Sequence, residues 1–241
     1  FTDGDRVTGT VVRTDMGAQW QLDPRTAIWA RTGQGQDDTA VTSNVAAQST
    51  AYRAETKDAG LRLTAMRDSG EWTLGLETGR SYKPLVNTGT GRRLELARAT
   101  DATGEGDGAF GSWKKRFDTL LVQTDLNLAR YRFDQTETIK TTTIATGLSS
   151  TQSLPQISRE VDANTVNFGL AWSPTASGTY RLAWQDLMRP AASLSLASQN
   201  TAGISLDVPG LQAGGRLKRL RLQGEWELST SNFLMAFADH R

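Results

Sequence analysis

The clearest fold signal in the chain is the stretch Arg219–Leu228, which reads RLRLQGEWEL. One set of alternate positions carries leucine, glycine and tryptophan, and the other carries only charged or amide side chains. A period of two with one apolar and one charged face indicates a β-strand whose charged face contacts water. The same alternation occurs at Val166–Trp172, Tyr180–Trp184, Trp72–Leu76 and Leu120–Leu128. Apolar residues at helical spacing do not persist anywhere, so the sequence predicts an all-β protein.

The composition of the 241 residues excludes several classes of protein. Lysine and arginine number 27 against 26 aspartate and glutamate, a balance that argues against a nucleic-acid binder held by phosphate charge. No run approaches the ~20 apolar residues of a transmembrane helix. The chain has no cysteine and a single histidine, His240, which argues against disulfides, thiolate chemistry and most metal sites. We therefore expect no metal and no cofactor.

About ten strands can be placed along the chain by this alternation. Short turn-like connections occur at 23–25, 68–70, 174–178 and 229–232, and long polar or glycine-rich ones at 33–45, 84–115, 146–160 and 189–215. A further turn is needed near Phe133–Thr136, where no glycine or proline marks it. Several strands reach the ~9–11 residues that cross a bilayer. The strands are expected at 6–21, 26–33, 47–66, 71–83, 117–132, 137–146, 161–173, 179–188, 216–228 and 233–240.

Aromatic residues gather beside the short turns and predict one ring of an aromatic girdle. The alternative is a soluble barrel or sandwich whose core these side chains cap. A soluble barrel of this size would have to bury the charged face of residues 219–227 unless its inside held water, so we favour an antiparallel transmembrane β-barrel. Its short turns would be periplasmic and its long loops extracellular. The predicted girdle residues are Trp20, Trp29, Trp72, Trp172, Tyr180, Trp226 and Phe233.

The polar faces of the predicted strands form a candidate pore lining. Mixed charges across a lumen would provide a wet path for polar solutes, and Arg219 with Arg221 would bias it toward anions. The alternative is a set of interior salt bridges that closes a narrow barrel. The candidate pore-lining residues are Arg219, Arg221, Gln223, Glu225, Glu227, Arg181, Gln185, Gln123, Asp125 and Glu77.

Two further motifs fall in the predicted 84–115 loop. Residues 106–111 match G-x-G-x-x-G, but the flanks lack the strand and helix that a dinucleotide site needs, so we expect an external loop. Asp101, Glu105 and Asp107 have oxygen ligands of the kind that Ca²⁺ prefers, although their spacing fits no EF-hand and we expect solvated loop residues.

Charged residues at two other places are candidates for function. Lys114–Arg116, at the end of that predicted loop, would contact lipopolysaccharide phosphates or simply form a charged rim. His240 with Asp239 is the one candidate catalytic pair, but a chain end holds a histidine poorly and no G-x-S-x-G elbow occurs. We therefore expect no enzyme and no catalytic residues.

Residues 166–241 resemble the late barrel strands of TonB-dependent receptors. The resemblance rests on Tyr180–Trp184 followed by Arg189-Pro190, then Leu217-Lys218, Trp226–Leu228 and the returning strand Phe233–Phe237. Barrels linked to tetratricopeptide-repeat proteins, some of which export polysaccharide, show a similar pattern. In this chain Arg219-Leu220 stands where the receptor family has Pro-Glu after Leu-Lys, and no preceding plug or TonB-binding box is evident.

Together these observations predict one outer-membrane β-barrel domain over residues 1–241, either alone or as part of a larger barrel. The expected function is a channel for polar solutes or glycans. The alternatives are a TonB-dependent receptor fragment for chelate or glycan uptake, a structural or adhesive barrel, and a soluble lipocalin-like binder. The expected partners are outer-membrane lipid and lipopolysaccharide, a small polar solute or glycan, and other barrel or periplasmic subunits. No nucleic-acid partner is expected.

Overall fold

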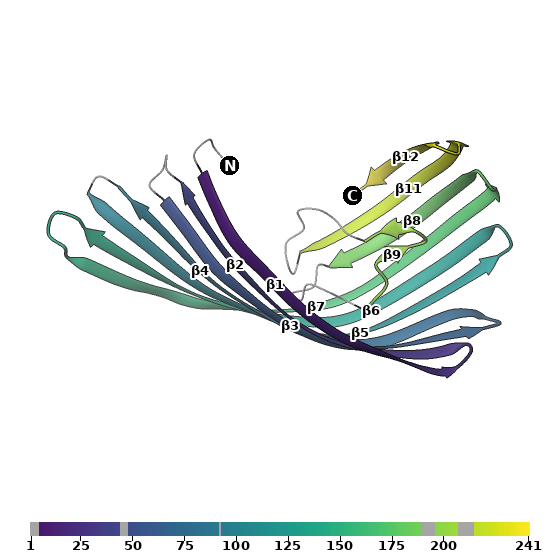
Figure 1. Ribbon diagram of the computed structural model, residues 1–241, viewed down its shortest axis with the longest axis horizontal. Coiled ribbons are helices and arrows are strands. Elements are labelled where there is room, and N and C mark those ends of the chain that lie inside the picture. The colour runs from purple at the N-terminus through teal and green to yellow at the C-terminus, as the bar shows by residue number, and fades with distance from the viewer. Residues whose placement is uncertain (1–4, 44–47, 92, 189–195, 207–214) are drawn as a thin grey trace.

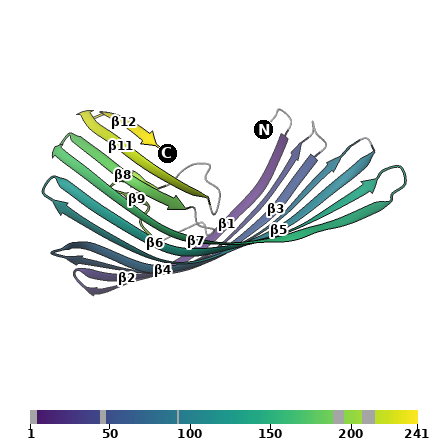
Figure 2. The ribbon, with the colours of Figure 1, turned by 180° about the vertical axis from the view of Figure 1, so that it is seen from behind.

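The computed structural model describes residues 5–43, 48–91, 93–188, 196–206 and 215–241, and confirms the all-β prediction. Ten strands form one antiparallel sheet in the order β1-β2-β3-β4-β5-β6-β7-β8-β11-β12, and the short strands β9 and β10 pair separately. Figure 1 shows the sheet bent into a deep curve, with β9 inside it. The same curve is seen from behind in Figure 2. Within the described ranges, no helix is long and apolar enough to cross a membrane. The strands are β1 (Asp5–Asp23), β2 (Thr26–Ser43), β3 (Gln48–Arg67), β4 (Gly70–Thr90), β5 (Leu94–Phe117), β6 (Leu120–Thr143), β7 (Ser149–Thr175), β8 (Gly178–Met188), β9 (Asn200–Thr201), β10 (Ile204–Ser205), β11 (Arg216–Ser229) and β12 (Asn232–His240).

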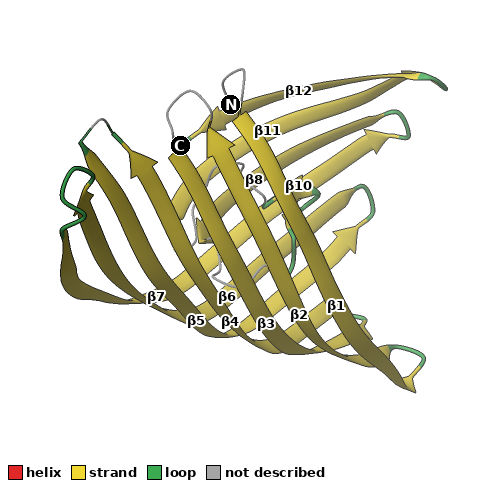
Figure 3. Cartoon of the chain, turned by 60° about the vertical axis from the view of Figure 1, so that its left-hand side comes forward, coloured by secondary structure: helices red, strands yellow, loops and turns green. Residues whose placement is uncertain are grey.

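One rim of the sheet, here called the short-turn rim, consists of two-residue turns. Successive antiparallel strands bring these turns to the same edge (Figure 3). Local chemistry fits two of these bends: the Arg25 backbone N–H donates to Asp23 Oδ1 over 2.7 Å, and Gly70 takes a φ of +127°. The turns lie at 24–25, 68–69, 118–119, 176–177 and 230–231.

Three of the four predicted long loops are largely strand, so that prediction was wrong. β2 continues to Ser43, β4 to Thr90, and β5 fills most of 84–115. The predicted turn near Phe133–Thr136 is absent because β6 runs unbroken from Leu120 to Thr143. The predicted strands 117–132 and 137–146 are therefore one strand, β6. Because β5 was not predicted, the sheet still has ten strands. Only the 189–215 connection remains long.

The 146–160 region is also strand, but it contains an irregularity. Gln135 on β6 pairs with Ile157, whereas Glu137 pairs with Leu154, so β7 carries one extra residue there. Pro155 lies in this bulge, where the backbone is not paired, so its lack of an N–H costs no hydrogen bond between the strands. The sheet thus stays paired across a stretch that resembles a loop in sequence.

The two faces of the sheet have opposite polarity. Leu222 on the convex face is 56% exposed, while Gln185 on the concave face is fully buried. Soluble proteins place these residue types the other way round, whereas lipid-facing barrels expose aliphatic side chains outward. Leu220 and Leu182 share the convex face with Leu222, as the alternation predicted.

The apolar part of the convex face is a band with a sharp upper limit. In the β6–β7 pair, Leu126 lies opposite Val166, but two residues further Leu128 meets Asn164 and then Arg130 meets Asp162. The Arg130 Nε–Asp162 Oδ1 distance is 3.1 Å. β6 continues to Thr143, which at about 3.3 Å per residue adds on the order of 40 Å of strand beyond this apolar band.

Candidate functional site: the concave wall and its docked strap

All ten candidate pore-lining residues lie on the concave face. On β11 they occupy the alternate positions from Arg219 to Glu227, and the register continues this face through Gln185 and Arg181 on β8. Glu77 on β4 and Gln123 with Asp125 on β6 extend the same face across the sheet. Strict alternation in these strands made their facing readable from sequence. We call this surface the concave wall.

A segment of the long connection, residues 196–206, lies against this wall, and we call it the strap. Its centre is the β9–β10 hairpin, in which Thr201 pairs with Ile204 around Ala202 and Gly203. The φ values of +51° at Ala202 and +88° at Gly203 fit a two-residue type I′ turn. The sequence predicts only a long loop over this segment, and the hairpin differs from that prediction.

On one side, β6 holds the strap through an amide and a carboxylate. Gln123 Nε2 donates to the Asn200 carbonyl over 2.8 Å, and Gln123 Oε1 accepts from the Ala202 N–H over 2.9 Å. Asp125 accepts from the Thr201 hydroxyl over 3.4 Å and from Ser112 over 2.6 Å. The Gln123 side chain therefore satisfies one backbone group in the incoming strand of the hairpin and one at its tip.

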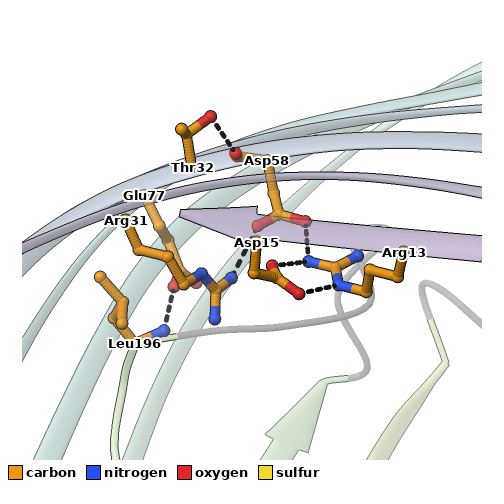
Figure 4. Close-up of polar contacts among 7 residues, drawn as sticks. All are labelled: Arg13, Asp15, Arg31, Thr32, Asp58, Glu77 and Leu196. Atoms are coloured by element: carbon orange, nitrogen blue, oxygen red, sulfur yellow. Dashed lines mark hydrogen bonds and ion pairs between the residues drawn. The ribbon is translucent and has the colours of Figure 1, made fainter. Parts of the chain in front are cut away.

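On the other side, β8 and β11 hold the strap through its carbonyls. Arg181 Nη1 donates to the Ala202 carbonyl over 2.9 Å, and Gln185 Nε2 donates to the Ile204 carbonyl over 3.1 Å. Arg219 Nη2 donates to the Ser205 carbonyl over 2.7 Å. The Leu196 N–H reaches across to Glu77 Oε2 on β4 over 3.1 Å (Figure 4). The strap thus ties four strands of the wall together.

Small wall residues make room for the hairpin tip. A Cβ at Gly169 on β7 would lie 2.7 Å from both the Ala202 Cβ and the Thr201 Cγ2, so a larger residue would push the tip away. Ala171 and Leu121 form a small buried apolar cluster with Ala202. Thr201, Ala202 and Ile204 are buried as a result.

Two further wall arginines are paired with carboxylates. Arg181 binds Glu225 through two contacts of 3.2 and 3.0 Å, and Arg221 binds Asp239 through two of 2.5 and 2.6 Å. Arg219 donates to Gln185 and to the strap instead. The two arginines expected to act together on anions therefore have separate partners. Glu227, next to the short turn, is exposed.

A second polar cluster on the wall was missed by sequence analysis. Arg13 on β1 and Arg31 on β2 share the Asp58 carboxylate, with N–O distances of 2.8 and 2.6 Å, and Arg13 also binds Asp15 (Figure 4). The Asp58 side chain is 2% exposed. Polar residues at alternate positions of β1–β3 were the available signal, but they lie among glycine and threonine in a stretch without aliphatic alternation.

Aromatic side chains line the convex face beside the short-turn rim. Trp172 and Tyr180 have ring centroids 5.7 Å apart, Trp226 lies 5.7 Å from the same tyrosine, and its Nε1 donates to the Tyr180 hydroxyl over 3.3 Å. Trp72 lies 6.3 Å from Trp113, which the sequence analysis did not include because it was assigned to a loop. Trp20 on β1 faces the same side.

The prediction that all girdle residues share one face is wrong for two of them. Trp29 pairs with Arg62 on the concave face, and the Arg62 guanidinium lies 5.3 Å from its ring centroid. Phe233 pairs with Glu227, which is also concave. Both residues belong to continuous apolar runs, where alternation cannot tell one face from the other.

The remaining motifs lie on β5 and not in a loop. Residues 106–111 are strand, and a Cβ at Gly106 would lie 2.6 Å from the Tyr131 ring, so this glycine makes room for an aromatic side chain. Asp101 accepts from the Tyr82 hydroxyl over 3.2 Å, and Glu105 pairs with Arg80. Among the described residues, no group of three potential metal-binding side chains was found.

The basic triad and the chain end also differ from expectation. Lys114–Arg116 lies beside the 118–119 turn on the short-turn rim, opposite to the rim expected for it, because β5 replaces the predicted loop. The Lys115 ammonium donates to the Asp68 carbonyl over 3.0 Å. Asp239 faces the concave side and His240 the convex side, so the two side chains do not form a pair.

Comparisons with known proteins support the fold. The chain is similar to the ferric yersiniabactin uptake receptor FyuA from Yersinia pestis, with 10% identity and a TM-score of 0.64 over 99% of this chain and 37% of that one. It is similar to the siderophore receptor PiuA from Acinetobacter baumannii, with 15% identity and a TM-score of 0.64 over 98% and 40%. The ferric-catecholate import receptor Fiu from E. coli K12 gives 11% identity and a TM-score of 0.58 over 99% and 41%.

These likenesses confirm an outer-membrane barrel fold that resembles the barrels of TonB-dependent receptors. The chain spans about two-fifths of the length of each of these receptors. No protein-family profile matches it, and no curated protein sequence matches it.

Proposed function

We propose that this chain forms barrel wall in an outer membrane and that the space bounded by the concave wall conducts polar solutes. The observation that carries the proposal is the inverted polarity of the sheet. Aliphatic side chains form the convex apolar band, and charged and amide side chains occupy the concave wall at the same height. A lipid-facing outside with a polar interior is the arrangement of transmembrane barrels with aqueous interiors.

The aromatic side chains support the same placement. Tryptophan and tyrosine favour the boundary between lipid and water, and here they lie beside the short-turn rim at one end of the apolar band. Outer-membrane lipid would then contact the band from outside. In barrels of this kind the short turns face the periplasm, so the long strand extensions would project outward from the cell.

A receptor barrel is the second candidate function. In the described part of the chain, β1 and β12 each pair with only one strand of the large sheet, and the similar receptors are more than twice as long. Further strands that pair with these two edges would satisfy their backbone groups in lipid. Uptake of a small chelate, as the names of the similar receptors state for them, would then be the activity of the larger barrel.

Reconstitution of the full-length protein separates the two candidates. A channel should migrate faster unheated than heated in detergent gels and give stable conductance steps in planar bilayers. A receptor should migrate in the same way but give no steady conductance, and a ferric chelate should quench its tryptophan fluorescence saturably. Failure to enter liposomes at all would contradict both.

A further inference from the structure

We propose that the strap presents a neutral polar surface on the concave wall that favours uncharged, hydroxyl-rich solutes over ions. This inference rests on the proposed channel function and names its substrate class. It also replaces the anion preference expected from Arg219 and Arg221.

The strap covers two wall charges of opposite sign. Asp125 is 2% exposed and Arg219 is 3% exposed. The contacts of Asp125 are to the hydroxyls of Ser112 and Thr201 and the amide of Gln123, and those of Arg219 are to Gln185 and a strap carbonyl. Neither charge reaches the interior of the curve at the level of the strap.

The strap replaces these charges with neutral polar groups. Residues 196–206 read LASQNTAGISL and include no charged side chain. Thr201, Ala202 and Ile204 face the wall, while Gln199, Asn200 and Ser205 are exposed on the opposite side. Amides and hydroxyls both donate and accept hydrogen bonds, as sugar hydroxyls do. An ion passing the strap would lose water and meet no counter-charge on the strap itself.

Hydrogen bonds to the wall hold the strap in this position. The wall satisfies strap backbone groups at Leu196, Asn200, Ala202, Ile204 and Ser205. Irregular backbone at membrane depth is tolerated where protein or a water-filled space surrounds it and its polar groups are bonded. Gly169 provides the space for the tip.

Swelling of proteoliposomes in glucose, glucosamine and galacturonate tests the proposal with three sugars of similar size and different charge. The full-length parent should admit glucose fastest. Gln199→Lys should raise the rate for galacturonate and lower it for glucosamine, Gln199→Glu should do the reverse, and neither should change the glucose rate much. These substitutions are on an exposed position, so folding should be unaffected.

Release of the strap gives the second arm. Gly169→Val should displace the hairpin, increase conductance and abolish the preference for glucose. Gly89→Val is the matched control, because a Cβ at that concave position meets nothing closer than 3.6 Å. An Ala202→Cys label site in this cysteine-free chain should be protected from a thiol reagent in the otherwise unchanged protein and become reactive when combined with Gly169→Val.

The outcomes distinguish the two proposals. Equal rates for the three sugars in the parent, or Gln199 variants that leave the ratios unchanged, would overturn the strap inference while the channel stands. A reactive Ala202→Cys without Gly169→Val would overturn the docked strap. No swelling with any sugar would overturn the channel function and with it the selectivity assigned here.

Discussion

The two halves of the long strands differ in what their outer face carries. Between the short-turn rim and Arg130, the convex face is apolar, with Leu126 and Val166 opposite one another. Beyond Arg130 the same strands carry ion pairs outside, such as Arg130–Asp162 and Arg53–Asp38. The backbone ladder is continuous through both halves. Under the proposed membrane placement, alternation between apolar and polar residues marks the part of the strands that faces lipid, and it ends where both faces of a strand are polar.

The largest expected difference between the two halves is in the loss of stability caused by an arginine on the convex face. Leu126→Arg should cost ~2–4 kcal/mol of unfolding free energy, because it places a charge in the apolar band near the bilayer midplane. Thr138→Arg on the same face of the same strand should cost much less, since it lies in the charged half. Denaturant titration in lipid vesicles measures both, and equal costs would contradict the boundary at Arg130.

A carboxylate on the concave wall should matter more than one on the outer face of the water-exposed half. Asp58→Asn removes the charge that Arg13 and Arg31 share, and should cost ~1.5–3 kcal/mol, the range for hydrogen bonds to charged groups. Asp38→Asn breaks an exposed pair with Arg53 and should cost ~0–1 kcal/mol. Unfolding curves of the two variants, measured side by side, should show the larger loss of stability for Asp58→Asn. A larger loss for Asp38→Asn would contradict the greater importance assigned to the concave carboxylate.

Two tryptophans near the short-turn rim test which face of the sheet contacts lipid. Trp113→Leu removes the contact with Trp72 and a 2.9 Å bond to the Ser69 carbonyl, and should cost ~0.5–1.5 kcal/mol. It should also reduce the quenching of tryptophan fluorescence by brominated lipids. Trp29→Leu is the control, and because Trp29 is on the concave face it should leave that quenching unchanged. Strong lipid quenching at Trp29 would contradict its register.

The smallest effect is expected at the short-turn rim itself. The backbone N–H of Arg25 lowers the pKa of Asp23 below its ordinary value of 3.8. A lowered folded-state pKa means that this carboxylate stabilises the turn above pH 3.8 and that its contribution is lost as the pH falls through the folded-state pKa. The difference in stability between the parent and Asp23→Asn should therefore shrink in acid, as followed by unfolding midpoints. A difference independent of pH would show that the carboxylate charge has no role.

The sequence predicted the fold and the facing of the wall wherever one face was aliphatic. Arg219, Arg221 and Gln223 could be assigned because leucine alternates with them. β5 could not, because its Gly106–Gly111 stretch resembles a loop in sequence, whereas in the structure Gly106 makes room for the Tyr131 ring on β6. The predicted facing of Trp29 and Phe233 was wrong for the opposite reason, since apolar residues flank them on both sides.

The strap could not be predicted because its order comes from distant side chains. No local pattern links Gln123 or Arg219 to residues 196–206, and the glycine that admits the tip lies on β7. Ala202-Gly203 alone is a weak hairpin signal. The contacts that fix the hairpin exist only after the sheet has brought β6, β8 and β11 together.

The tie between Leu196 and Glu77 also constrains the order of assembly. These residues are 119 positions apart in the chain, and the other strap contacts join β6, β8 and β11. Closing such a long loop has a high entropic cost until the intervening hairpins have formed. The strands can pair one neighbour at a time, but the strap has nothing to bind until β4 through β11 share one sheet. Insertion would therefore proceed through an intermediate without the docked strap, and the strap would dock only after β4 through β11 had paired.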